Sequence, residues 1–463
     1  MLKRTLLIAA AVFATAAMAQ NSEKTLRQLQ QDFVNLRFGM FIHYNIPTYM
    51  DDDWADPDAS PEIFNPTKLD PRQWAEAAKA ANMSYGCLTT KHHSGFCIWN
   101  TKTTDYNVMN SPYKKDVVKE YAEAFRSQGL KVMLYYSILD THHKLRPRQI
   151  QPQHIEMVKN QLTELLSNYG EITALIIDGW DAPWSRISYD EIPFEEIYRL
   201  VKSIQPNCLL MDLNAAKYPS EALFYTDIKS YEQGAGQHIS KESNRLPALS
   251  CLPINDNWFW KRSFPRRPVK SAEEMVHSNI VPMNQAYCNF ILNVAPNRDG
   301  LIDENAVKAL REIGRMWKNE GAVSPLPPFD APIISSNIAK YRPANSSWGN
   351  DMSIMDFAND DRFGSSWHSN PAVRTPWWEV ELAGSRPFNL ISIMEGGGDL
   401  RIKKYRIEYL DNNVWKTLPV EPKEGRVKIH RFGRVWATRI RITIDEYTDA
   451  PAIAEFGVYD EIN

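Results

Sequence analysis

The sequence is constrained most by short apolar runs that alternate with amphipathic segments over about 300 of its 463 residues. Parallel strands need a crossover connection, usually a helix, so this alternation is typical of a parallel sheet covered by helices. We expect strands near residues 37–43, 85–91, 131–137, 175–178, 208–212, 223–226 and 289–294, and helices near 23–36, 70–81, 115–128, 151–169, 193–204 and 303–318. The length of the repeat and the lack of a glycine-rich phosphate loop favour a closed ring. The predicted fold is α/β, a (β/α)8-like TIM barrel.

Polar side chains recur where the predicted strands end. The clearest case is Leu175-Ile-Ile-Asp178-Gly179, in which a buried apolar strand runs directly into a carboxylate and a glycine that permits a sharp turn. His43, His92 and His93 end two earlier strands, and Asp212 ends a later one. In TIM barrels the catalytic groups lie at this end of the strands. The pattern therefore predicts a site at the C-terminal face of the barrel.

The pattern changes after residue 320. Residues 321–332 are rich in proline, as expected of a linker, and residues 333–463 contain short alternating strands with no helical stretch. We therefore expect a signal peptide at 1–19, a barrel at 20–320, the linker at 321–332, and a β-sandwich at 333–463.

The N-terminus predicts export. Lys3 and Arg4 precede an apolar stretch too short to span a bilayer, and Ala17-Met-Ala19 is a small-x-small cleavage site. The mature protein is expected to begin at Gln20 and to be secreted or periplasmic, with no membrane span. The net charge of −3 provides no basic field for nucleic acid, whereas 14 Trp and 20 Tyr suit stacking on sugars.

Two carboxylates are sufficient to cleave a glycosidic bond, one as nucleophile or water-positioning base and one as proton donor. Asp178 is the first candidate. Glu232 is favoured as the second because it follows a strand-like run and is flanked by Tyr231. Glu242 is its rival, and Asp227 is either another candidate or a helix cap.

Metal chemistry is not indicated by the sequence. The five cysteines show no close pairing, and neither a CxxC pair nor an HExxH motif is present. His92 and His93 are adjacent, so on a strand they point to opposite faces and cannot easily share an ion. At a strand end both are able to bind sugar hydroxyls. We therefore expect no metal and no cofactor.

Several motifs, in order, resemble the α-L-fucosidases of glycoside hydrolase family 29. They are Phe38-Gly-Met-Phe-Ile-His43, Lys91-His-His-Ser-Gly-Phe-Cys-Ile-Trp99, Gly129-Leu-Lys131, Tyr135-Tyr-Ser137 and Asn293-Val-Ala-Pro296. The likeness covers residues 25–320. It implies a (β/α) barrel with a retaining, metal-free mechanism and a fucosylated oligosaccharide or glycan as substrate. Carboxyl groups about 5–5.5 Å apart are then expected.

The resemblance also implies roles for particular residues. Asp178 matches the nucleophile, and Glu232 is similar in spacing to the acid/base of part of the family. His43, His92, His93 and Trp54 match residues that hold the fucose. One tyrosine of the pair Tyr135-Tyr136 should face the sugar, and we assign Tyr136. The chain departs from the family pattern at Ile176, where relatives often have Trp, and at Asp53, where they often have Glu.

The C-terminal region resembles discoidin-like (F5/8 type C) modules in Trp377-Trp-Glu-Val-Glu-Leu382 and Tyr405-Arg-Ile-Glu-Tyr-Leu410. Such a module either binds sugar or braces the barrel, and the sequence leaves both open. It also leaves two alternatives to a fucosidase: a fucose-binding protein on an inactive barrel, and a hydrolase of a related sugar such as an α-L-galactoside.

Overall fold

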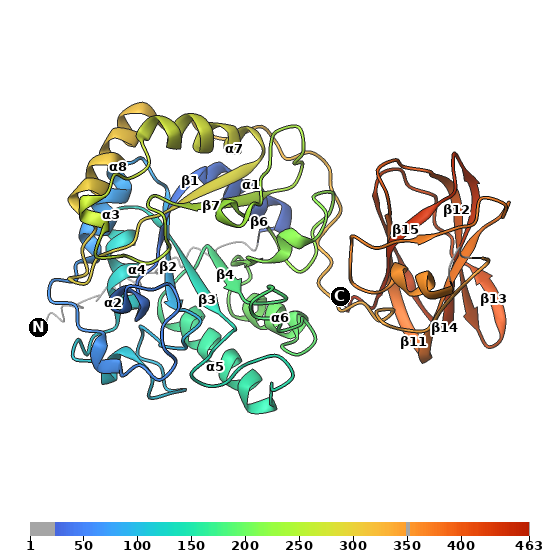
Figure 1. Ribbon diagram of the computed structural model, residues 1–463, viewed down its shortest axis with the longest axis horizontal. Coiled ribbons are helices and arrows are strands. Elements are labelled where there is room, and N and C mark those ends of the chain that lie inside the picture. Colours follow the sequence, from blue (N-terminus) through green and yellow to red (C-terminus); the bar gives the residue numbers. More distant parts are fainter. Residues whose placement is uncertain (1–23, 349–351, 463) are drawn as a thin grey trace, which may run out of the picture.

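The computed structural model describes residues 24–348 and 352–462. The chain forms two lobes, a barrel and a smaller β domain, shown from blue to yellow and from orange to red (Figure 1). The predicted signal peptide lies outside the described residues. None of the helices between residues 24 and 462, in the parts described, is long and apolar enough to cross a membrane.

The barrel contains eight parallel strands, so the predicted fold class is confirmed. Their order is β5-β4-β3-β2-β1-β8-β7-β6, and sequence neighbours are therefore spatial neighbours almost throughout. The strands are β1 Phe38–Ile42, β2 Tyr85–Lys91, β3 Lys131–Ser137, β4 Ala174–Asp178, β5 Leu209–Asp212, β6 Lys229–Glu232, β7 Ala248–Pro253 and β8 Cys288–Asn293. β7 was not predicted from the sequence.

Helices cover the outside of this ring (Figure 1). Their ends follow ordinary capping rules: Asp70 accepts a hydrogen bond from the Arg72 amide with Pro71 at the first helical position, as predicted. The α-helices are α1 Leu26–Leu36, α2 Pro47–Met50, α3 Pro71–Ala80, α4 Val117–Ser127, α5 Pro152–Asn168, α6 Phe194–Ile204, α7 Val281–Gln285 and α8 Glu304–Met316. Short 3-10 or π turns occur at Pro61–Ile63, Val108–Asn110, Ala215–Lys217, Gln233–Ala235, Phe264–Arg266, Glu274–Ile280 and Met352–Ala358.

Successive residues of each strand point alternately into the ring and toward the helices, which produces two apolar cores. Met133, Tyr135 and Ile176 belong to the inner core. Leu134 and Tyr136 belong to the outer one, between strands and helices. The parity of a residue along its strand therefore decides whether its side chain faces the interior of the ring.

The ring closes between β5 and β6 through a seam made by residues 226 and 227. The Asp227 amide donates to the Leu210 carbonyl (2.8 Å), and the Leu210 amide donates to Asp227 Oδ2 (2.9 Å). The Asp212 amide donates to Thr226 Oγ1 at 3.2 Å. The predicted strand at 223–226 is therefore wrong: Phe224 instead bridges to Ile333, just after the predicted linker, and the strand begins at Lys229.

The second domain is an antiparallel β-sandwich, again as predicted. Its strands are β9 Ala344–Ser346, β10 Trp367–His368, β11 Trp377–Glu395, β12 Ile402–Asp411, β13 Val414–Thr417, β14 Val427–Tyr447 and β15 Ala452–Tyr459. β11 and β14 are long, with breaks in their pairing register between Glu381 and Arg386 and between Phe388 and Leu390. Such breaks bend paired strands.

Candidate active site

A small pocket lies at the C-terminal ends of the barrel strands. Its volume is about 200 Å³, below the range of roughly 300–1,000 Å³ typical of sites for drug-sized ligands. Six of the seven residues predicted to form the site line it. The lining residues are Phe41, His43, Asp53, Trp54, His92, His93, Tyr135, Asp178, Trp184, Leu213, Glu232 and Trp258.

Asp178 ends β4 at an inward-facing position and is almost fully buried. Its Oδ2 accepts a hydrogen bond from the Tyr135 hydroxyl (2.7 Å), and its Oδ1 accepts one from Asn214 Nδ2 (2.9 Å). Burial raises the pKa of Asp178, while these bonds and one from the Gly179 amide oppose the rise. Three donors therefore stabilise the carboxylate form and hold it in place.

Glu232 ends β6 and is more exposed than Asp178. Burial and the nearby charge of Asp178 raise its pKa from 4.5 to about 7, opposed by a hydrogen bond from the Trp258 side chain. Near neutral pH this carboxyl therefore holds a proton much of the time. Two carboxyls in one pocket, one with three donors to its carboxylate and the other with a pKa near neutrality, have the environments that a nucleophile and an acid require.

The three histidines are neutral hydrogen-bonding groups. Burial lowers the pKa of His43 to about 4 and that of His93 to about 3, and it lowers the pKa of His92 well below its usual range. The 3.9 Å contact between His93 Nε2 and Asp178 Oδ2 is therefore not an ion pair.

Neighbouring groups select the tautomer of two of these rings. Asn293 gives its amide N–H to the Trp258 carbonyl (2.7 Å), so its Oδ1 accepts from His43 Nδ1 at 2.8 Å. The Ser137 hydroxyl donates to the Leu139 carbonyl (2.9 Å), so its oxygen accepts from His93 Nδ1 at 2.7 Å. Both rings consequently keep a lone pair on Nε2, which is suited to accept a hydrogen bond from a sugar hydroxyl.

The assignment of Tyr136 to the site needs correction. Tyr136 is fully buried in the outer core, where its hydroxyl bonds Lys91 Nζ (3.0 Å) and Gln161 Oε1 (2.7 Å). The strand parity places Tyr135 inward instead, against Asp178.

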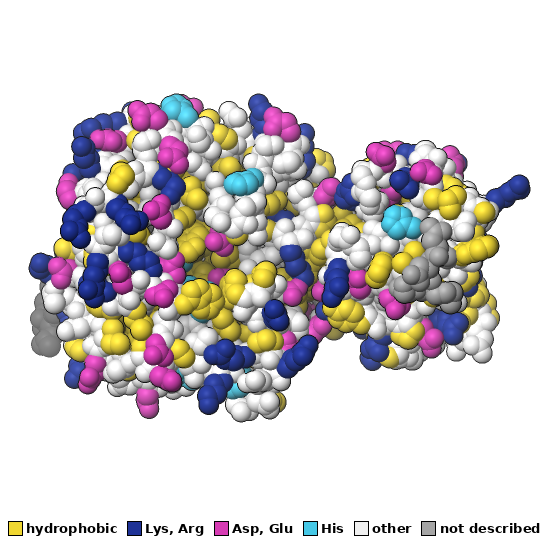
Figure 2. Space-filling view, in the orientation of Figure 1, with side chains coloured by type: hydrophobic (Ala, Val, Ile, Leu, Met, Phe, Trp, Pro, Cys, Tyr) yellow, Lys and Arg dark blue, Asp and Glu magenta, His cyan; other side chains and the backbone are white. Residues whose placement is uncertain are grey.

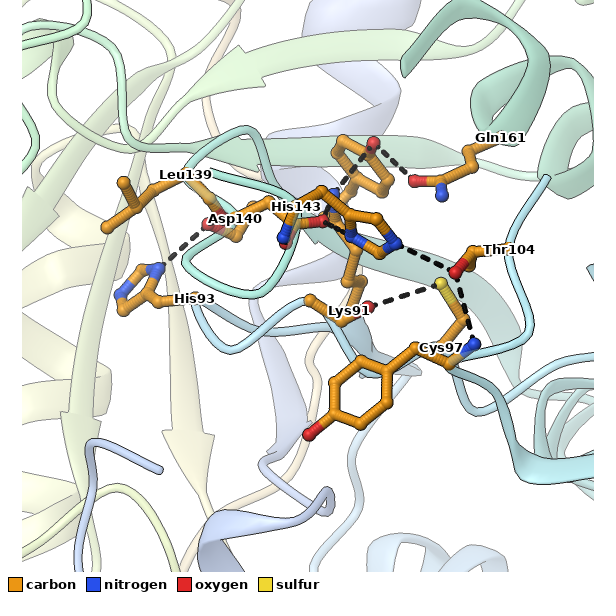
Figure 3. Close-up of polar contacts among 12 residues, drawn as sticks. Lys91, His93, Cys97, Thr104, Leu139, Asp140, His143 and Gln161 are labelled. Carbon is orange, nitrogen blue, oxygen red and sulfur yellow. Dashed lines mark hydrogen bonds and ion pairs between the residues drawn. The ribbon is translucent and has the colours of Figure 1, made fainter. Parts of the chain in front are cut away.

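Lys91 is central to a buried polar network that includes Asp140 and His143 (Figure 3). Its ammonium lies 3.2 Å from Asp140 Oδ2, and both side chains are fully buried. Asp140 also binds His143 Nδ1 at 2.9 Å. The Thr141 amide donates to the His93 carbonyl (2.8 Å), so this network fixes the chain that carries the two histidines.

Two partly exposed tryptophans form the rim of the pocket. Trp54 is 48% exposed and Trp184 is 42% exposed, and their ring centroids lie 5.5 Å apart. Both rings also contact His93, at 4.7 and 4.3 Å. Nearby, Asp53 accepts from the Phe259 amide (3.2 Å) and pairs with Lys261 (3.1 Å), which ties the loop after β1 to the loop after β7.

The rival acids lie elsewhere. Asp227 is fully buried in the seam, where it pairs with Lys202 at 2.8 Å. The Glu242 side chain is 70% exposed on a surface turn. Asp212 ends β5 but has the outward parity of Leu210 and accepts a hydrogen bond from the Tyr189 hydroxyl.

Five residues that touch the pocket or its nucleophile candidate were missed. Leu213, Asn214 and Trp184 lie in loops just beyond β5 and β4, where proximity to a strand end is the signal that points to them. Trp258 lies in a loop after a strand that was not predicted. Phe41 lies two residues before His43 and shares its parity.

Metal binding by this site finds no support in its donors. Within residues 24–348 and 352–462, no group of three His, Cys, Asp or Glu side chains is arranged to hold a metal ion. All five cysteines are buried free thiols. The pocket can therefore be described in terms of two carboxyl groups, neutral imidazoles and aromatic rings.

Comparisons with known proteins agree with this geometry. The family model described as alpha-L-fucosidase matches residues 48–322, and the F5/8 type C domain model matches residues 335–456. Alpha-L-fucosidase 1 of Arabidopsis thaliana is 29% identical over 453 residues, which cover 91% of this chain and 84% of that protein.

Two further relatives extend the comparison. Human plasma alpha-L-fucosidase is 26% identical over 341 residues, covering 64% of this chain and 69% of its own. The crystal structure of a glycoside hydrolase 29 family member from an unknown rumen bacterium has a TM-score of 0.54 at 26% identity. It covers 94% of this chain and 77% of that one.

Proposed function

Because the chain belongs to the α-L-fucosidase family, we propose that it is a secreted, retaining exo-α-L-fucosidase in which Asp178 is the nucleophile and Glu232 the acid/base. The observation that carries the proposal is the contrast between the two acids of one pocket. Burial raises the pKa of both acids, but three hydrogen bonds to the carboxylate oppose the rise at Asp178, whereas only one, from Trp258, opposes it at Glu232, whose pKa reaches about 7.

The first step forms a glycosyl-enzyme. Asp178 attacks the anomeric carbon of the fucose, the glycosidic bond breaks, and Glu232 transfers its proton to the departing oxygen. In the second step the Glu232 carboxylate takes a proton from water. The water oxygen bonds to the anomeric carbon and releases Asp178, which leaves Glu232 protonated again.

Action on terminal residues is supported by the small size of the pocket. A volume of about 200 Å³ suits one sugar ring, and the rim tryptophans lie where the leaving group would emerge. The neutral histidines provide acceptors for the sugar hydroxyls.

The experiment that tests the mechanism is hydrolysis of an aryl α-L-fucoside followed by proton NMR. A retaining enzyme releases the α-anomer first, which then equilibrates. Initial release of the β-anomer would refute double displacement. Aryl α-L-galactosides assayed beside it test the related-sugar alternative, and fucose binding without turnover would indicate a binding protein.

Export is a separate part of the proposal and rests on the sequence of residues 1–19. Intact-mass measurement of the protein recovered from periplasm or medium should give a chain that begins at Gln20. A chain that keeps Met1 and stays in the cytoplasm would contradict it.

A further inference from the structure

The C-terminal sandwich meets the barrel beside the active-site loops. Side chains of both charges lie along the junction between the two lobes (Figure 2). Lys217, in the turn after β5, forms an ion pair with Asp181, in the loop after β4, and lies 3.7 Å from Asp361 of the C-terminal domain. A second pair joins Lys340 to Asp190 at 3.0 Å.

Lys217 is partly enclosed by aromatic rings from both domains. Its ammonium lies 4.8 Å from the Tyr218 ring centroid and 5.9 Å from that of Phe363, and those two rings are 4.9 Å apart. The Lys217 and Asp361 side chains are only 25% and 20% exposed. Ion pairs in such surroundings are screened less than pairs on an open surface.

Both barrel segments held by Lys217 carry parts of the active site. Asp181 lies three residues after Asp178 and three before Trp184 of the rim. Lys217 lies three residues after Asn214, whose amide donates to Asp178 Oδ1 at 2.9 Å. Asp361 is thus connected through one side chain to the loops that carry a rim tryptophan and a hydrogen-bond donor of the nucleophile candidate.

We propose that Asp361 is a positioning residue for catalysis, and that the sandwich uses its contact with Lys217 to fix the loops carrying Asn214 and Trp184. The inference rests on the proposed function, since it assigns a catalytic consequence to the hydrogen bond between Asn214 and Asp178. It gives the sandwich a role in the reaction that does not require sugar binding.

The consequence can be read from the ionisation of Asp178. Asn214 stabilises the charged carboxylate, so a poorly held Asn214 raises the pKa of Asp178 and moves the acidic limb of kcat/KM to higher pH. The other groups that face this carboxyl are Tyr135 of β3, His93 after β2, the Gly179 amide after β4, and Glu232 of β6. Asp212 of β5 faces outward and interacts with Asp178 through its charge.

Asp361 itself is faced by charges of both signs. Burial raises the pKa of Asp361, Lys217 and Lys340 oppose the rise by stabilising its carboxylate, and Asp181 and Asp190 add to the rise. Asp361→Asn keeps the size and polarity of the side chain and removes the charge, so it is the least disruptive way to weaken the hold on Lys217.

The test measures kcat/KM against pH for the full-length protein with an aryl α-L-fucoside. Asp361→Asn should move the acidic limb up by about half a pH unit, because partial loss of a charge-assisted hydrogen bond changes a pKa by this order. Asn214→Ala should move it further. Glu446→Gln is the matched control, because it removes the exposed pair with Lys404 in the same domain and should leave the limb in place.

The double variant Asp361→Asn/Asn214→Ala makes the inference decisive. If Asp361 acts through Asn214, adding Asp361→Asn to Asn214→Ala shifts the limb no further. An Asp361→Asn protein that melts earlier with an unmoved limb would show a merely structural contact and overturn the inference. A full additional shift in the Asn214→Ala background would also overturn it. In both cases hydrolysis of the aryl α-L-fucoside by the wild-type protein would still support the proposed function.

Discussion

The protonation of Glu232 depends on a hydrogen bond from one neighbouring side chain, that of Trp258. Burial and the charge of Asp178 raise the pKa of Glu232 to about 7, and the hydrogen bond from the Trp258 side chain opposes that rise. Trp258→Phe removes this donor and keeps an aromatic ring beside His43. Because the donor stabilises the charged form of Glu232, its loss should raise the pKa of Glu232 further.

The size of the effect follows from the bond that is lost. A hydrogen bond to a buried charged group is worth about 1.5–3 kcal/mol, and ~1.4 kcal/mol corresponds to one pKa unit. Since Glu232 is partly exposed, we take the lower end and expect a rise of about one unit. Glu232 then stays protonated to higher pH, and the basic limb of kcat/KM moves from about pH 7 toward about pH 8.

The assay is the pH profile of kcat/KM with an aryl α-L-fucoside for wild type and Trp258→Phe. Trp260→Phe is the matched control: it lies two residues away, but its indole N–H donates to Asp303 Oδ2 (2.6 Å) and it does not line the pocket. Its basic limb should match that of wild type. A basic limb that stays in place, or falls, in Trp258→Phe would refute the assignment of Glu232 as the acid.

Three further predictions follow from the site and the seam. Asp178→Ala should reduce turnover of an aryl α-L-fucoside by roughly a thousandfold or more, and near wild-type turnover would exclude it as the nucleophile. Trp184→Ala should raise KM about three- to tenfold for a fucosylated disaccharide by loss of stacking, but not for α-L-fucosyl fluoride; equal changes for both would place Trp184 against the fucose instead. Asp227→Asn should destabilise the fold by about 3 kcal/mol by leaving Lys202 without its buried partner. A calorimetric Tm equal to that of wild type would argue against the seam.

Sequence reasoning located most of the barrel because the signals were local. The apolar run before Asp178 and the Asp70-Pro71 cap define their elements without tertiary information. It failed at β6, where a lysine had to be buried. Lys229 Nζ donates to the carbonyls of Ala215 (2.9 Å) and Tyr218 (2.6 Å), and burial lowers its pKa to about 7. These partners come from a loop that periodicity does not place.

The site shows the same division. Carboxylates and imidazoles at strand ends could be picked out because strand ends are readable from hydrophobicity. The choice between Tyr135 and Tyr136 could not be made from the sequence. Alternation places the two side chains on opposite faces of β3, but only the finished ring shows which face is the inner one. Trp258 depends on the loop after β7, whose position is set by contacts with Asp53, 204 or more residues away in sequence.

The seam between β5 and β6 bears on how the stereochemical outcome of the reaction can change during evolution. Asp178 and Glu232 stand on opposite sides of it, and side chains of residues 226 and 227 supply part of its closure. Whether such an enzyme keeps or inverts the anomeric configuration depends on how far apart its two acids are. Substitutions at this seam are therefore a route by which the distance between the two acids can change while the seven pairings between neighbouring strands persist.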